Sequence, residues 1–96
     1  LCYVPEQIEC ACEGRPVNFS FSEKTNSQDL KPVQRITWSI TGWRAETYIA
    51  AAGAGQCATY AGRAGFHPID RLGGHIIKTE EDLRIAQALW PLCMES

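Results

Sequence analysis

The sequence predicts a small, secreted, disulfide-stapled α+β domain, and three observations lead to this prediction. Two stretches alternate apolar and polar residues with the period of a half-buried strand. Two later stretches are rich in helix-forming residues and carry apolar stripes at helical spacing. Five cysteines occur within 96 residues, which suits an oxidising compartment. We expect residues 1–96 to form a single domain, because a chain of this length supports one hydrophobic core.

The chain is expected to begin irregularly and then to form its first strand. Residues 1–7 include Cys2 and Pro5 and would be an irregular lead-in. Residues 8–13 are a candidate strand, and the Gly-Arg-Pro sequence that follows would turn or break the chain. The first strand would therefore carry the Cys-x-Cys motif discussed below.

Two alternating stretches, 17–22 and 35–41, predict half-buried strands. The residues from 23 to 32 are polar and turn-rich, so we expect them to form an exposed, mobile loop. The two strands would then pair as a hairpin with a long loop, and Trp38 would face the core. A helix that begins near Asp29 is the alternative interpretation of this region.

Two helices are expected in the second half of the chain, with short strands at 56–60 and 75–78 between them. The first helix covers residues 43–52. The second begins after Thr79, which would cap it, with Asp82 completing an imitation of a capping box. The predicted inner stripes are Ala45, Ile49 and Ala52 in the first helix and Leu83, Ala86 and Trp90 in the second.

The cysteines are the features around which this domain would be organised. Side chains two positions apart in a strand point to opposite faces of a sheet, so Cys10 and Cys12 need two distant partners. We prefer Cys12–Cys57 and Cys10–Cys93, although the swapped pairing stays open because spacing does not determine connectivity. Cys2 would then be left over, as a free thiol or as a bond between two copies.

Composition and charge argue against several classes of function. The net charge is −2 and no long basic run exists, which disfavours nucleic-acid binding as the main role. No stretch approaches the roughly 18 apolar residues of a membrane span. The chain begins at Leu1 without a methionine, so we expect a mature product from which a signal peptide has been removed. The sequon at Asn18 predicts a glycosylation site and is consistent with secretion.

Several of these motifs occur together in one known family. They are Glu9-Cys10-Ala11-Cys12, the alanine-rich stretch from Tyr48 to Cys57, Gly74-His75, the acidic helix start Thr79-Glu80-Glu81-Asp82-Leu83-Arg84, and the final Cys93. In these motifs, which cover roughly half of its length, the chain resembles small secreted fungal proteins built like the alpha subunit of the virus-encoded killer toxin of smut fungi. A second likeness, to pair-acting effectors of vascular-wilt and blackleg fungi, rests on size and cysteine economy.

The resemblance to the killer-toxin family carries its own expectations. It implies a ferredoxin-like sandwich in which two helices pack on one face of an antiparallel sheet, and it supports the pairs Cys12–Cys57 and Cys10–Cys93. The chain departs from the family in having fewer cysteines, in lacking a last strand before its end, and in an apparent insertion from Val17 to Thr41.

Two histidines and three tryptophans are the candidates for chemistry and for binding. His67 and His75, with a cation such as Lys78 or Arg63, could perform general acid–base catalysis, although nothing in their spacing fixes a geometry. Cys10 and Cys12 lie too close together for a usual zinc knuckle, and we expect no metal and no cofactor.

A protein-binding surface is the preferred interpretation. Trp43 stands beside Arg44 at a helix start and is predicted to be partly exposed, where it could anchor a partner. Tyr60 and Phe66, which lie among glycines, are secondary candidates. Trp90, in contrast, is expected to pack in the core.

The sequence thus favours a secreted fungal effector, a virulence or avirulence protein of a plant pathogen, over an enzyme. Its partner would be a host protein or a companion secreted effector. A killer-toxin-like antimicrobial protein is the alternative, and a small secreted hydrolase or ribonuclease is the second alternative. We expect an extracellular location, and later entry into host cells is open.

Overall fold

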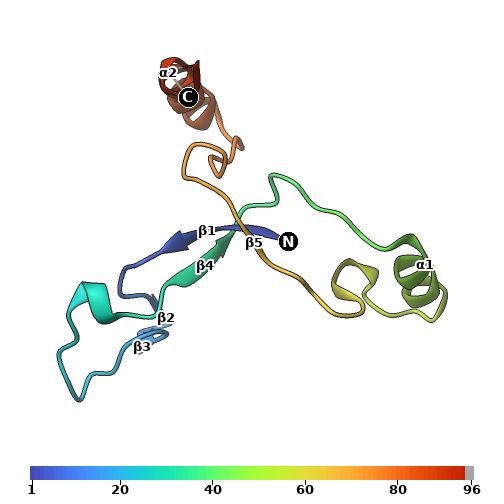
Figure 1. Ribbon diagram of the computed structural model, residues 1–96, viewed down its shortest axis with the longest axis horizontal. Helices are drawn as coiled ribbons and strands as arrows, with labels where there is room; N and C mark the ends of the chain where they lie inside the picture. The colour runs from blue at the N-terminus through green and yellow to red at the C-terminus, as the bar shows by residue number, and fades with distance from the viewer. Residues whose placement is uncertain (95–96) are drawn as a thin grey trace.

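The chain forms an open, three-armed α+β molecule, seen in a computed structural model that describes residues 1–94 (Figure 1). Its three arms meet at a small central sheet, and the expected α+β class with two helices is confirmed. The elements are β1 (Cys2–Glu6), β2 (Ala11–Cys12), β3 (Arg15–Pro16), η1 (Ser27–Asp29), β4 (Val33–Ile36), α1 (Ala45–Gly53), η2 (Ala58–Tyr60), β5 (His67–Pro68) and α2 (Glu80–Met94).

The central sheet has the order β4-β1-β5 and is mixed. β1 pairs antiparallel with β4, opposing Tyr3 and Ile36, and parallel with β5, opposing Cys2 and His67. The prediction of an irregular lead-in over residues 1–7 is therefore wrong. Pro5 is tolerated in this strand because β5 pairs only with the first two residues of β1, so β1 is an edge strand at the proline.

The first predicted strand is much shorter than expected. In this region only the two-residue strands β2 and β3 pair with each other. They form a hairpin whose two-residue loop is Glu13-Gly14. Both loop residues have positive φ, 51° and 77°, as the twist of a type I′ hairpin turn requires. The strand predicted over 17–22 does not form, and the side chains of Val17 and Phe21 are exposed rather than half-buried.

The strand predicted over 35–41 ends early, because β4 stops at Ile36. Trp38 has a φ of 60°, a left-handed conformation that is costly for a bulky residue and that interrupts an extended strand. Its side chain is 43% exposed, so the prediction that it faces the core is wrong. The helical alternative near Asp29 reduces to the single turn η1, and the loop over 23–32 is exposed as predicted except for the half-buried Thr25 and the buried Leu30.

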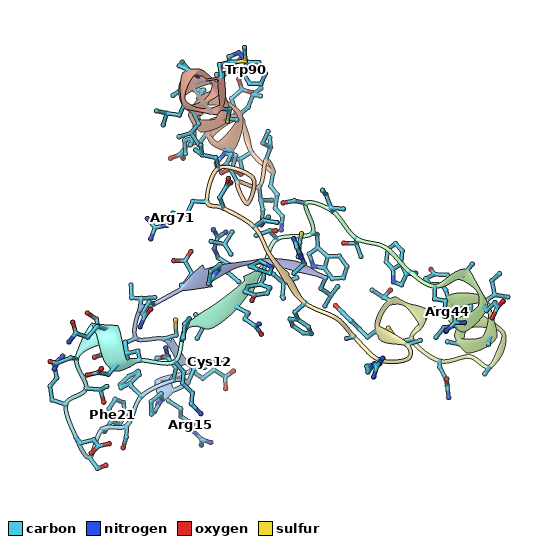
Figure 2. All side chains as sticks on the ribbon, viewed as in Figure 1. Cys12, Arg15, Phe21, Arg44, Arg71 and Trp90 are labelled. Carbon is cyan, nitrogen blue, oxygen red and sulfur yellow. The ribbon has the colours of Figure 1, made fainter. Side chains whose placement is uncertain are left out.

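The two helices do not cover the sheet. α1 packs on η2, and α2 has no comparable contact with any other element of residues 1–94. The radius of gyration is 17.4 Å, against about 12.5 Å for a compact domain of this length. The structure therefore has the predicted helices without the sandwich packing, and Trp90, predicted to be inward, is 63% exposed near the tip of the α2 arm (Figure 2).

Both helices nevertheless begin close to their predicted starts. In α2, the Thr79 hydroxyl accepts the Asp82 N–H at 3.1 Å, and the Asp82 carboxylate accepts the Thr79 N–H at 3.0 Å. These two bonds form the predicted cap. In α1 the predicted stripe is wrong, because Ala51 is the buried residue and Ile49 is exposed. The short strands expected at 56–60 and 75–78 are the turn η2 and irregular chain.

The core lies where the arms meet. Val4 and Cys2 of β1 are buried there with Thr37, and Gly74 packs directly on Val4. A Cβ added at Gly74 would overlap Val4 Cγ2, so only glycine permits this approach of the chain to the sheet. Gly74 is thus the position that fixes where the α2 arm leaves the core.

The predicted disulfides are not formed in this structure, since Cys10, Cys12 and Cys57 carry free thiols. A bridge requires Cα atoms within about 7 Å. Cys12 lies in the hairpin arm and Cys57 follows α1 in another arm, so they lie far apart (Figures 1 and 2). Cys93 lies in α2, away from the hairpin arm that holds Cys10.

Cys2 is a free thiol, one of the two states expected for it. It is only 3% exposed, and the Ile40 N–H donates to its sulfur at 3.3 Å. Hydrogen bonding by the Thr37 hydroxyl, and then by the Ile40 N–H, lowers the pKa of Cys2. A bond between two copies through Cys2 would require this buried sulfur to become exposed, so this arrangement does not support the predicted dimer.

Candidate functional site

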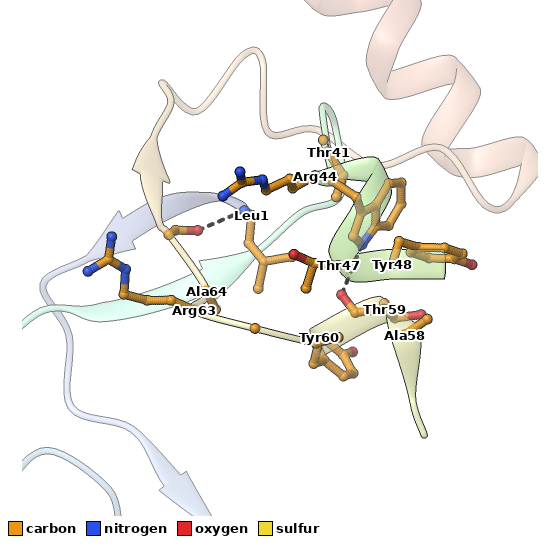
Figure 3. Close-up of a pocket in the computed structure, with 15 residues that line it drawn as sticks. Leu1, Thr41, Arg44, Thr47, Tyr48, Ala58, Thr59, Tyr60, Arg63 and Ala64 are labelled. Atoms are coloured by element: carbon orange, nitrogen blue, oxygen red, sulfur yellow. Dashed lines mark hydrogen bonds between the residues drawn. The ribbon is translucent and has the colours of Figure 1, made fainter. Parts of the chain in front are cut away.

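A pocket of about 270 Å³ lies between the start of α1, η2 and the segment that follows η2 (Figure 3). Its volume is at the small end of ligand pockets and suits one or two side chains of a partner. The lining residues are Leu1, Thr41, Gly42, Trp43, Arg44, Thr47, Tyr48, Ala58, Thr59, Tyr60, Ala61, Gly62, Arg63, Ala64 and Gly65.

Trp43 is held in place on one side of the pocket by two contacts. Its indole N–H donates to the Thr59 carbonyl at 3.0 Å, the dashed line beside Tyr48 in Figure 3. The Tyr48 ring packs edge-on against it, with 5.6 Å between ring centroids. Trp43 remains 49% exposed, as predicted, so a fixed aromatic surface faces solvent.

Tyr60 provides a second aromatic surface and connects the pocket to the sheet. Its ring contacts that of Trp38 with 6.0 Å between centroids. Trp38 lies two residues beyond β4, so this contact joins the end of the sheet to η2. The residue with the left-handed backbone, Trp38, is thus also the one whose ring meets Tyr60.

A glycine allows the two walls of the pocket to approach each other. Gly62 has a φ of 74°, and a Cβ on it would lie 2.9 Å from Thr47 Cγ2 on α1. Both the left-handed backbone and the missing side chain are therefore needed where the chain after η2 passes the helix. This explains locally why the turn at Gly62 closes the pocket against α1.

The polar groups of the pocket are cationic and hydroxylic. Arg44 precedes α1, and its carbonyl accepts the Tyr48 N–H at 3.0 Å while its side chain caps no helical N–H. Arg63 follows η2 on the other wall. The Thr41 hydroxyl oxygen is buried, and no partner for it exists among residues 1–94. No Asp, Glu, His or Cys is among the described residues that line the pocket.

The predicted partner-binding residues are brought together only in part. Trp43, Arg44 and Tyr60 line one pocket, whereas Phe66 packs against Tyr3 at 6.3 Å between centroids and is not part of the lining. Sequence reasoning did not select Tyr48, because the alanine-rich helix around it suggested only packing. Thr59 contributes a backbone carbonyl, for which no sequence signal exists.

The histidines are placed separately from this pocket. His67 lies in β5, and the His75 ring nitrogen Nε2 lies 2.8 Å from the Asp82 carbonyl in the first turn of α2. His75 thus has a local structural contact. Within residues 1–94, no group of three or more His, Cys, Asp or Glu side chains is arranged to hold a metal ion.

Asn18, the predicted glycosylation site, has a structural role in the hairpin arm. Its side-chain amide donates to the Ile8 carbonyl at 2.8 Å and to the Lys31 carbonyl at 2.9 Å, and its oxygen accepts the Cys10 N–H at 2.8 Å. A glycan on this nitrogen would leave one N–H, so at most one of the two donated bonds would survive.

Comparison with known proteins leaves the pocket as the main guide to function. No family model, no curated protein and no solved structure matches the chain. The killer-toxin resemblance accordingly rests on the sequence motifs. No helix within residues 1–94 is long and apolar enough to cross a membrane.

Proposed function

We propose that the protein is a secreted fungal effector that acts by binding a host protein or a companion secreted effector. The observation that carries this proposal is the set of three partly exposed rings, Trp43, Tyr48 and Tyr60, fixed around one pocket by ring contacts and a hydrogen bond. Trp, Tyr and Arg dominate the energetics of protein interfaces. Because rigid aromatic side chains lose little entropy on binding, they are effective anchors.

Secretion and the killer-toxin-like fold belong to the same proposal. The five cysteines, the Asn18 sequon and the family motifs support an extracellular protein, with later entry into host cells as an extension. In an oxidising compartment the bridges Cys10–Cys93 and Cys12–Cys57 would draw the arms into the two-helix sandwich. The exposure of Cys12, Cys57 and Cys93 supports the formation of these bridges, because an oxidant can reach the three side chains.

A pull-down with matched tryptophan variants tests the binding function. The protein serves as bait for host extract and for the secretome of the producing organism. We expect a stoichiometric partner that Trp43→Ala loses and Trp90→Ala retains, because Trp90 is also exposed but lies in a different arm. Equal loss with both variants, or no partner in either extract, would reject a binding site centred on Trp43.

An antimicrobial role is the second candidate, and one observation favours it. α2 exposes an unusual number of apolar side chains for a helix of this length: Leu83, Ile85, Trp90, Leu92 and Met94. Such a helix can lie in a membrane interface, yet interfacial helices are usually rich in Lys and Arg. α2 has only Arg84 against three acidic residues in its first turn. Inhibition of competing fungi at micromolar dose, lost on Trp90→Ala, would establish this second role.

A further inference from the structure

We infer that the pocket beside α1 binds an acidic peptide segment, in which a carboxylate pairs with Arg44 and Arg63 and a neighbouring apolar side chain lies against Trp43 and Tyr48. This inference rests on the proposed protein-binding function and specifies the chemistry of the partner. It follows from charge, from the arrangement of the pocket walls, and from an unsatisfied hydroxyl.

The charge of the pocket is opposite to that of the chain. The whole sequence has 11 acidic and 9 basic residues, yet the described lining holds two arginines and no carboxylate. The ion pairs found within residues 1–94, Lys24–Glu9 and Arg35–Glu6, involve neither of these arginines. Guanidinium groups bind carboxylates through paired charge-assisted hydrogen bonds, so an anionic side chain is the complementary ligand.

The pocket separates its cationic and aromatic groups. In Figure 3 the guanidinium groups of Arg44 and Arg63 reach toward the side on which Leu1 lies, while the Tyr48 ring lies on the opposite side. Arg44 belongs to the wall formed by α1 and Arg63 to the wall formed by the chain after η2. A ligand that satisfies both parts has a charged group and an apolar group close together, as adjacent residues of a peptide do.

The hydroxyl of Thr41 adds a polar requirement. Its oxygen is buried without a partner among residues 1–94, and Thr41 lines the pocket. Buried polar groups are almost always hydrogen-bonded, and this oxygen has almost no exposed surface, so a ligand carbonyl or N–H would complete it only after the Thr41 side chain turns toward the pocket. A peptide backbone provides both groups.

A single-stranded nucleic acid also combines anionic and flat groups, but the observations favour a peptide. Nucleic-acid grooves neutralise many successive phosphates, whereas this pocket offers two cationic side chains on a chain of net charge −2. The volume of about 270 Å³ also suits one or two side chains.

The test is an NMR titration of the isotopically labelled full chain at low salt. The probes are an acetylated, amidated peptide with an Asp-Leu-Asp centre, its Asn-Leu-Asn counterpart, and a hexauridine oligonucleotide. We expect the Trp43 indole N–H to shift with the Asp peptide, and Arg44→Gln or Arg63→Gln each to weaken binding by about tenfold, the usual strength of a charge-assisted bond. Arg71→Gln, in a different part of the molecule, is the matched control and should bind as the unmodified protein does (Figure 2).

The first four outcomes below reject the inference, and the fifth rejects only the proposed function. Equal binding of the Asp and Asn peptides would exclude carboxylate recognition, and an equal loss with Arg71→Gln would reduce the effect to overall charge. Tighter binding of hexauridine would assign the pocket to nucleic acid. A captured partner that depends on Trp43 but not on Arg44 or Arg63 would preserve the proposed function and reject the acidic ligand. Binding of the Asp peptide without any captured partner would support the acidic ligand and reject the proposed function.

Discussion

α1 and α2 differ in how they are stabilised, and the difference separates local from tertiary causes of structure. α2 has a complete N-terminal cap, with Thr79 and Asp82 exchanging hydrogen bonds, and three acidic residues that complement its dipole. α1 begins after Arg44, which caps none of its N–H groups. Yet α1 packs on η2 and builds a pocket, whereas α2 packs closely on no other element of residues 1–94.

The comparison shows that the best local signal does not mark the arm that carries the pocket. Caps contribute about 1 kcal/mol and define where a helix starts, but they do not bring other residues to it. The pocket depends instead on Gly62, on the ring of Tyr48, and on a bond to the Thr59 carbonyl.

The largest expected effect is closure of the open arms by oxidation. If Cys10–Cys93 and Cys12–Cys57 form, the radius of gyration should fall from 17.4 Å towards about 12.5 Å, because both helical arms are drawn to the sheet. Small-angle scattering of oxidised and reduced protein, with peptide mapping of the bridges, measures this. A Cys12→Ser variant should keep the α1 arm open while α2 closes. An unchanged radius in fully bridged protein would reject the sandwich.

Gly62→Ala should specifically destabilise the α1 arm. The new methyl would meet Thr47 Cγ2 at 2.9 Å on a left-handed backbone, so we expect a loss of about 1–3 kcal/mol in the free energy of unfolding. Urea denaturation followed by tryptophan fluorescence measures the loss. Gly65→Ala is the matched control, since a Cβ there meets nothing within 4 Å. Equal effects of the two substitutions would contradict the packing described for Gly62.

Sequence reasoning succeeded where a feature depends on neighbouring residues. The start of α2, the exposure of Trp43 and the exposed loop over 23–32 all follow from local chemistry, and the structure confirms them. The α+β class was likewise predicted from local patterns, and the structure has both helices and strands. These features require no knowledge of which distant segments meet.

Sequence reasoning failed where a distant partner decides the outcome. Residues 2–6 form a strand because β4 and β5 pair with them, and no alternation in their own sequence indicates those neighbours. The stretch over 17–22 alternates well, yet Asn18 binds the carbonyls of Ile8 and Lys31 and no strand forms there. Phe66 lies outside the pocket lining and packs on Tyr3 of the central strand, while its ring stays exposed, so its role in binding stays a prediction.

Thr79→Ala should weaken α2 without affecting the α1 arm. The substitution removes the hydroxyl that accepts the Asp82 N–H, at an expected cost of about 1 kcal/mol in helix stability. Because α2 packs on no other element of residues 1–94, the loss should appear as local fraying. Amide exchange in α2 should accelerate while the Trp43 indole resonance stays unchanged. Thr25→Ala, in the exposed loop, is the control, and a shift of the Trp43 resonance by Thr79→Ala would show that the arms are coupled.

The smallest expected effect is the response of α2 to acid. The Lys78 N–H, and then the Thr79 hydroxyl and N–H, hold the pKa of Asp82 below its usual value of about 3.9. A carboxylate with a lowered pKa in the folded state stabilises the helix fully above its unfolded pKa, and this contribution is lost as pH falls through the lower folded pKa. Helicity of α2 should therefore stay constant from neutral pH to about pH 4 and decline below it. Asp82→Asn should remove the acid-dependent step, whereas Glu81→Gln, on a neighbouring carboxylate for which no bond to the cap is seen, should retain it. A decline that persists in Asp82→Asn would mean that acid acts elsewhere, and the cap would then contribute less to α2 than its geometry indicates.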